Sequence, residues 1–309
     1  MSNNALTVEN LNKIYSNFKT KKKTKAIKDL TFKVKEGEVF GLLGPNGAGK
    51  TTFLNILGGT VTKTSGLVNV WGFDLDKNPR QVKASIGIVP QEVNLDAFFS
   101  PKQLLELQAG LYGVAKNDRI TDLILKMVAL EGKANAYSRS LSGGMKRRLL
   151  IAKAMVHQPP ILILDEPTAG VDVELRNNLW DNVKKLNLEG VTIILTTHYL
   201  LEAQEMCDRI AIIDKGNIVA LDTTENLLKR IKTKKINFKV KKVELDAPLL
   251  LDGIEFKIIS ENLISATYEK SSLNFGEIIN YFNQNNIKID DIFTDDGDLE
   301  DVFIQLTKH

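Results

Sequence analysis

A short apolar run followed at once by a glycine-rich segment constrains the fold of this chain most strongly. Val39–Leu43 reads as a buried strand, Gly44–Thr51 fits the pattern G-x-x-x-x-G-K-[ST], and Thr51–Leu57 continues with helical spacing. In this order of strand, loop and helix, backbone N–H groups and a helix N-terminus converge on a phosphate. We expect Lys50 to reach the β- and γ-phosphates and the Thr51 hydroxyl to bind Mg²⁺. The segment therefore predicts a nucleotide site.

Further apolar runs predict an α/β fold with a mainly parallel sheet. Runs of four or five apolar residues, separated by helix-like segments, suit strands that are buried on both faces. The expected strands are Ala5–Tyr15, Ala26–Val34, Ile86–Val89, Ile161–Leu164, Val191–Leu195 and Ile210–Ile213, and Pro101–Lys133 has helical periodicity. Asp165 and Glu166 follow one of these strands directly, at the sheet edge where ligands bind in such folds. We expect Asp165 to hold Mg²⁺ and Glu166 to accept a proton from an attacking water.

Composition excludes several classes of protein and suggests two domains. With 309 residues, 43% hydrophobic and 26% charged, the chain resembles neither a disordered polymer nor a fibre. The single cysteine, Cys207, allows no internal disulfide. A net charge of +3 is too small to indicate nucleic-acid binding, and we expect none. No apolar run reaches the roughly 18 residues of a membrane span, and Met1–Asn4 does not resemble a signal peptide, so we expect a cytosolic chain.

Charge patterning marks a change near residue 226. Residues 229–242 contain eight basic residues and no acidic one, whereas residues 290–301 contain seven acidic residues and no basic one. We expect a boundary here, with residues 226–309 forming a small α+β domain. The two blocks are either solvated faces or surfaces that attract each other or a partner. The basic segment Lys19–Lys25 is read as a hairpin tip, with an anionic lipid or nucleotide contact as the alternative.

The segment Leu141–Gly144, which we call the signature segment, begins another predicted helix. Ser142 is expected to cap a helix that runs to His157, with Lys146, Arg147 and Arg148 in its first turns. Cations there oppose the helix dipole, which suits a bound anion. Since Lys50 already supplies a phosphate site, this second site is expected to act on the nucleotide of another subunit. The alternative is a plain turn whose basic side chains point to solvent.

Taken together, these motifs resemble the ATP-binding cassette (ABC) family over about residues 5–225. The resemblance adds a glutamine loop at Gln91, a loop at Pro167–Asp172, a switch histidine at His198 and an adenine-stacking aromatic at Tyr15. Two positions depart from the family pattern: Met145 replaces a glutamine and Ala169 a serine. The resemblance implies a P-loop NTPase fold with a mixed sheet in residues 1–225, and a helical subdomain at about residues 92–160.

The resemblance also implies roles for individual residues in a head-to-tail dimer that sandwiches two ATP molecules. Catalysis would involve Glu166, His198, Gln91 and Lys50, and Mg²⁺ would be bound by Thr51, Gln91 and Asp165. ATP would be bound by Tyr15, Gly44, Pro45, Asn46, Gly47, Ala48, Gly49, Lys50, Thr51 and Thr52, by Ser142, Gly143 and Gly144 of the opposite subunit, and by Asp172.

One cassette in one short chain favours the ATPase subunit of a transporter. Lys50 and Ser142 are only 92 residues apart, so no long coiled coil separates them as in chromosome-type ATPases, and translation-type proteins usually carry two cassettes. Thr168–Asp172 and Leu299–Ile304 resemble ABC-2-type exporter ATPases. We therefore expect an export ATPase at the cytoplasmic face of the membrane, bound to a separate multi-span permease. An importer subunit and a soluble translation-associated ATPase are the alternatives.

Overall fold

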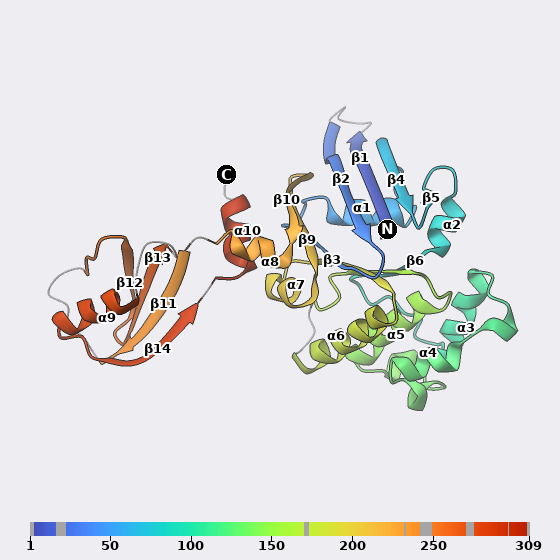
Figure 1. The fold of residues 1–309 in the computed structure, drawn as a ribbon. Helices are drawn as coiled ribbons and strands as arrows, with labels where there is room; N and C mark the ends of the chain where they lie inside the picture. Colours follow the sequence, from blue (N-terminus) through green and yellow to red (C-terminus); the bar gives the residue numbers. More distant parts are fainter. Residues whose placement is uncertain are drawn as a thin grey trace. The chain divides into compact units, whose positions relative to one another are not determined.

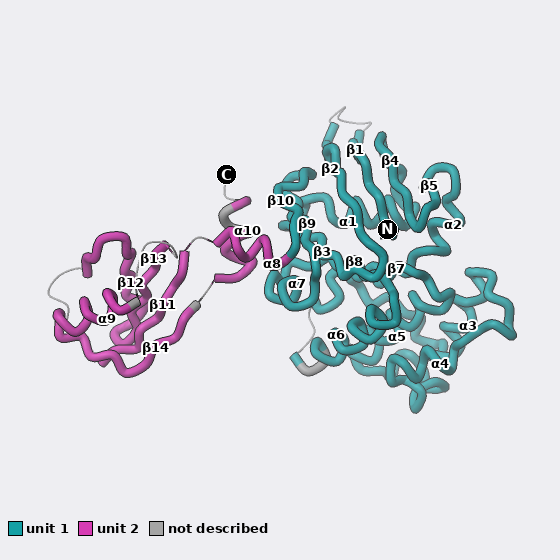
Figure 2. Tube along the Cα trace, viewed as in Figure 1, with its two compact units in different colours: residues 1–223 teal, residues 224–309 magenta. Residues whose placement is uncertain are grey.

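The computed structural model describes residues 3–16, 23–169, 173–231, 233–241, 249–269, 275–295 and 297–307 (Figure 1). They form two units, residues 1–223 and 224–309 (Figure 2), and the expected boundary lay after residue 225. None of the helices among these described residues combines the length and the apolarity that crossing a bilayer requires.

A six-stranded sheet forms the centre of the first unit, in the order β10-β9-β3-β8-β7-β6. Its strands are β3 (Val39–Leu43), β6 (Ile86–Val89), β7 (Ile161–Asp165), β8 (Thr192–Thr197), β9 (Arg209–Asp214) and β10 (Asn217–Thr223). All neighbours are parallel except β9 and β10, which form an antiparallel hairpin. The α/β fold with a mainly parallel sheet, expected from the apolar runs, is therefore confirmed, and the parallel strands end at one common edge.

A second, antiparallel sheet has the order β2-β1-β4-β5. It consists of β1 (Asn4–Ser16), β2 (Lys23–Lys35), β4 (Ser65–Val70) and β5 (Phe73–Asp74). Helix α1 (Lys50–Leu57) contributes to one apolar core that residues of both sheets share. In that core, the rings of Phe32 and Phe40 stack with centroids 5.3 Å apart, and Phe53 of α1 packs against Phe32. This packing fixes the helix that follows the glycine-rich loop.

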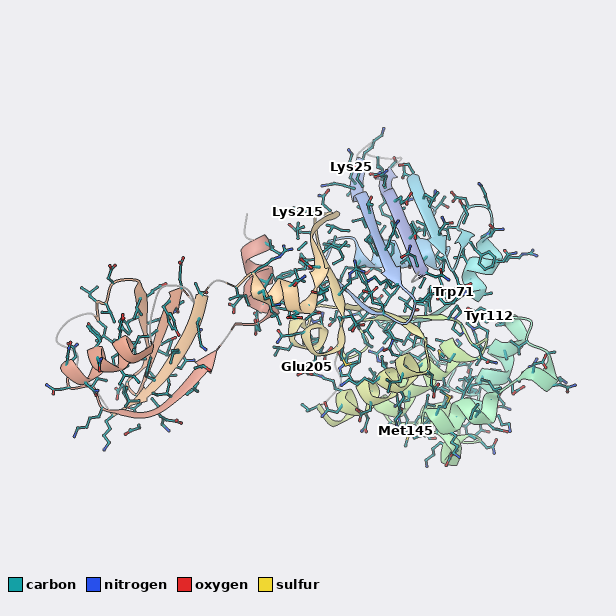
Figure 3. The ribbon with its side chains drawn as sticks, in the orientation of Figure 1. Lys25, Trp71, Tyr112, Met145, Glu205 and Lys215 are labelled. Atoms are coloured by element: carbon teal, nitrogen blue, oxygen red, sulfur yellow. The ribbon has the colours of Figure 1, made fainter. Side chains whose placement is uncertain are left out.

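The helical part of the first unit has an apolar core of its own. It is built by α3 (Pro101–Leu111), α4 (Thr121–Met127) and α5 (Gly143–Met155), whose buried leucines and isoleucines pack together. Ser100 begins α3 with a reciprocal capping box that includes Gln103. Tyr112 and Met145, labelled in Figure 3, both belong to this part. The remaining helices of the unit are α2 (Pro79–Ala84), α6 (Val173–Leu188) and α7 (Leu200–Met206).

The second unit is an antiparallel sheet with helices, of the order β12-β13-β11-β14. Its elements are α8 (Thr224–Lys229), β11 (Thr233–Val240), β12 (Ile254–Ser260), β13 (Leu263–Glu269), α9 (Phe275–Gln284), β14 (Ile289–Asp295) and α10 (Leu299–Thr307). Phe282 of α9 packs edge-on against Phe238 of β11. Strand β11 from the basic block pairs with β14 from the acidic block, and the register sets Lys239 opposite Asp291. This arrangement favours the interpretation that the two blocks attract each other.

Candidate nucleotide site

The glycine-rich loop between β3 and α1 requires glycine at its two ends. A Cβ atom at Gly44 would overlap the carbonyl oxygen of Ile213, and one at Gly49 would lie 2.7 Å from the carbonyl oxygen of Ala26. Gly49 also has a φ of 115°, in the left-handed region that other residues avoid. The loop is therefore held close to the sheet, and its backbone N–H groups lie at the N-terminus of α1.

Lys50 is the first residue of α1, and its side chain folds back over the loop. Its Nζ atom donates hydrogen bonds to the carbonyl oxygens of Gly44 (2.6 Å) and Pro45 (3.3 Å). Burial lowers the pKa of Lys50, while the nearby carboxylates of Glu166 and Asp165 oppose that shift. The ammonium group thus lies between the loop and two acidic side chains, where a phosphate would meet it.

Thr196, at the end of β8, holds both acidic residues that follow β7. Its hydroxyl donates a 2.6 Å hydrogen bond to Oδ1 of Asp165, and its carbonyl oxygen accepts one of 2.9 Å from the N–H of Glu166. Burial raises the pKa of Asp165, an effect that the Thr196 hydrogen bond opposes. Glu166 has a φ of 44°, an unusual backbone for a residue with a side chain and one that recurs at functional sites.

Two side chains from neighbouring strand ends converge on the buried carboxylate of Glu166. Nε2 of Gln91, which follows β6, donates a 2.9 Å hydrogen bond to Oε2 of Glu166. Nδ1 of His198, which follows β8, lies 3.2 Å from the same oxygen. Parallel strands bring their carboxyl ends to one edge of the sheet, which explains why residues 75 and 32 positions away meet here.

A pocket of about 480 Å³ joins most of the residues expected from the sequence. It is lined by Ala26, Pro45, Asn46, Gly47, Ala48, Gly49, Lys50, Thr51, Thr52, Gln91, Glu166 and His198. Tyr15 is outside this lining and is 41% exposed, with Nζ of Lys13 4.7 Å from its ring centroid. Ser142, Gly143 and Gly144 are also outside it, and Asp172 lies outside the described residues.

The signature segment begins α5 as expected, and two of its basic neighbours donate hydrogen bonds to backbone carbonyls. Ser142 caps the helix by accepting a hydrogen bond from the N–H of Met145. Arg147 is buried and donates to the carbonyl oxygens of Pro90 and Gln91. Arg148 donates to those of Val128 and Ala129. The expectation that this cluster suits an anion is wrong for Arg147, which is buried and already bound to two backbone carbonyls, and it stays a prediction for Lys146 and Arg148.

A buried cluster near the pocket had no signal in the sequence. Glu202 of α7 accepts a 2.6 Å hydrogen bond from the Thr168 hydroxyl, and its other oxygen lies 3.1 Å from Nε of Arg176. Burial raises the pKa of Glu202. Arg176 also lies over the ring of Tyr199, the residue next to His198. The cluster therefore ties the loop after Glu166 to the segment that carries His198.

The chain is similar to several known proteins. A family model described as ABC transporter matches residues 27–169. Linearmycin resistance ATP-binding protein LnrL of Bacillus subtilis (strain 168) is 40% identical over 228 residues, which are 73% of this chain and 71% of that protein. Nod factor export ATP-binding protein I of Cupriavidus pinatubonensis (strain JMP 134 / LMG 1197) is 40% identical over 207 residues, which are 66% of this chain and 64% of that protein. The chain thus spans less than two thirds of the latter's length.

Solved structures are also similar to most of this chain. The ATP-binding cassette MJ0796, in a dimeric post-hydrolysis state with ADP and Pi, has a TM-score of 0.62 and 28% identity, over 71% of this chain and 98% of that one. The cbiO1 protein of Clostridium perfringens, part of the ABC transporter complex cbiONQ, has a TM-score of 0.64 and 27% identity, over 74% of this chain and 94% of that one.

The chain therefore belongs to the ABC transporter family, as the motifs predict. It is the ATP-binding subunit of such a transporter, and its activity is the hydrolysis of ATP coupled to transport.

Proposed function

We propose that this subunit hydrolyses ATP in the pocket beside Lys50 and powers export through a separate membrane subunit at the cytoplasmic face. One observation carries the proposal: Gln91 and His198 converge on the buried carboxylate of Glu166 at the mouth of a phosphate-binding loop. Two contacts on one oxygen hold the carboxylate in a fixed orientation, and a general base must be held within reach of the water that it deprotonates.

The residues of the pocket suit a triphosphate with its metal ion. The backbone N–H groups of residues 46–52 and the ammonium group of Lys50 bind phosphate oxygens. Thr51, Gln91 and Asp165 offer the hard oxygen donors that Mg²⁺ prefers, and Asp165 is a partly buried carboxylate at the end of β7. Mg²⁺, when bound there, neutralises charge on the phosphates.

Glu166 acts as the general base in this proposal. Gln91 and His198 both contact its Oε2 atom, and we assign the attacking water to the other oxygen, Oε1. The hydrogen bond from Gln91 keeps the carboxylate in one rotamer. His198 is about half exposed, so it can also contact the γ-phosphate of ATP from the pocket side.

The signature segment acts on a second copy of the chain. Ser142 and Gly143 are exposed at the start of α5 and do not line the pocket of their own subunit. A head-to-tail dimer brings them to the nucleotide bound by Lys50 of the partner, and the MJ0796 cassette, a relative, was solved as a dimer. Tyr15 offers an exposed ring for the adenine.

A membrane partner has an exposed apolar surface available near Gln91. Phe98 is 73% exposed, and Leu107 and Leu111, one turn apart on α3, are 53% and 75% exposed. A groove of about 340 Å³ lies beside α3, lined among others by Pro90 and Tyr112. Such a surface suits a short amphipathic helix of a permease. Two relatives are named for export or for antibiotic resistance, which favours export over import.

The test is Glu166→Gln, with Glu205→Gln as its matched control. Glu205 is an exposed acid on α7 (Figure 3), so its substitution leaves the pocket intact. We expect Glu166→Gln to bind ATP, to lower turnover by roughly 100-fold or more, and to accumulate as an ATP-bound dimer in gel filtration. A variant that hydrolyses ATP at the wild-type rate and stays monomeric would refute the assignment.

A further inference from the structure

Arg147 is a buried cation that touches the glutamine loop from the helix of the signature segment. It lies one turn into α5 and is only 4% exposed. Its Nη1 atom donates to two consecutive carbonyl oxygens, those of Pro90 (3.1 Å) and Gln91 (2.7 Å). Among the described residues, no carboxylate lies within ion-pair distance of this guanidinium.

Burying a guanidinium without an acidic partner has a large desolvation cost. We therefore infer that the hydrogen bonds of Arg147 serve to position the backbone that they contact. A methionine of similar length could fill the same space without a desolvation cost. The two carbonyl contacts are directional, and they fix the two peptide groups that flank the Cα atom of Gln91. We therefore interpret Arg147 as a link between two elements rather than as core packing.

The elements that it links belong to different nucleotide sites. The helix start, Ser142 and Gly143, is exposed and does not line its own pocket, whereas the side chain of Gln91 donates a hydrogen bond to the Glu166 carboxylate of that pocket. A movement of α5 therefore moves Gln91 relative to Glu166, because Arg147 holds the backbone of Gln91 directly.

We propose that Arg147 is a positioning residue that couples the two ATP sites of the dimer. When the signature segment of one subunit binds the partner's ATP, Arg147 sets Gln91 against Glu166 in its own pocket. The proposal rests on the dimeric function proposed above. It explains why a cation is buried at this point of α5, where the sequence suggested an anion site.

The experiment measures ATP hydrolysis by the full chain against ATP concentration, for wild type, Arg147→Met and Arg148→Met. Arg148 is the matched control, since it is the next residue and donates to two carbonyl groups within the helical part. We expect a cooperative wild type, with a Hill coefficient between one and two for two sites. Arg147→Met should fall to a coefficient of one, with kcat lowered about tenfold and the ATP dissociation constant changed by less than about threefold. Arg148→Met should stay cooperative.

Arg147→Lys guards against a folding defect, because it keeps a donor and a charge. Its Hill coefficient should exceed that of Arg147→Met at equal melting temperature. A cooperative, dimeric wild type with an equally cooperative Arg147→Met would overturn this proposal alone. A wild type that stays monomeric with ATP and shows a coefficient of one would overturn the dimer, and this proposal with it.

Discussion

Nδ1 of His198 lies 3.2 Å from Oε2 of Glu166, although the two residues follow different strands. Replacing His198 by alanine removes this contact and the ring that borders the pocket. We expect kcat to fall by roughly 100-fold and KM for ATP to change by less than about threefold, because the histidine assists the reaction more than binding. His157→Phe is the control, since His157 does not line the pocket. Wild-type turnover by His198→Ala would contradict the role.

Thr196→Val tests the support of the two acidic residues. The change keeps the shape of the side chain but removes the hydroxyl that bonds Asp165. A buried acceptor that loses its donor costs about 1–3 kcal/mol, which urea unfolding measures. We also expect lower turnover. Thr192→Val is the comparison: its buried hydroxyl accepts from the N–H of Gly37, at the far end of the same strand. Equal loss of turnover in both variants would show that only general stability matters.

We predict that His157 makes the stability of the first unit sensitive to acid. Its ring stacks on Tyr112 with centroids 3.7 Å apart, and burial lowers its pKa, a shift that the contact with the Ile86 carbonyl opposes. The unfolded chain therefore binds a proton more readily than the native state. At pH values above 6.5, the ordinary pKa of histidine, the ring is neutral in both states and costs no stability. As the pH falls below 6.5, protonation of His157 in the unfolded chain lowers the free energy of unfolding, by at most about 1.4 kcal/mol per pH unit.

His157→Phe keeps an aromatic ring but cannot take up a proton. Between pH 7.5 and 5.5 we expect the wild type to lose on the order of 1 kcal/mol more stability than the variant, measured by urea unfolding. At pH 7.5 the free energy of unfolding of the variant should be lower by about 1 kcal/mol, because the contact between the ring and the Ile86 carbonyl is lost. Parallel pH profiles of the two proteins would exclude His157 as the cause.

A fragment of residues 1–223 should retain ATP binding and hydrolysis. Every residue that lines the pocket lies in this unit, which has its own cores. We expect its ATP dissociation constant, measured by calorimetry, to stay within about threefold of that of the full chain. A stably folded fragment that fails to bind ATP would show that the second unit contributes to the site.

Local patterns made the nucleotide loop and most central strands predictable. The structure of the segment from Val39 to Thr51 depends mainly on contacts between residues that are close in sequence. Its glycines, its lysine and the flanking apolar runs therefore make it recognisable. Strands β10 and β14 are harder to predict from the sequence. Asp290 and Asp291 disfavour strands on propensity, and only the pairing of β14 with the basic strand β11 offsets that tendency.

Contacts between distant segments could not be predicted from the sequence. Arg147 meets residues 56 and 57 positions away, and Thr168 meets Glu202 at a separation of 34. Such pairs depend on how the helices and strands pack together. A single sequence therefore does not show which groups the side chains of a basic cluster will contact. Thr196 lies two residues before His198 in the sequence, but its hydrogen bond to Asp165 follows from the parallel register of β7 and β8.

Arg148 joins the end of α4 to α5 through two carbonyl groups, in addition to the apolar core between these helices. We therefore expect the helices of this part to move together as one body. Any rotation of that body against the sheet has to be absorbed by backbone torsions in two connections, residues 91–100 and residues 156–160. The first of these connections begins at Gln91, whose backbone Arg147 holds. The catalytic glutamine therefore lies in the segment about which the helical part would rotate.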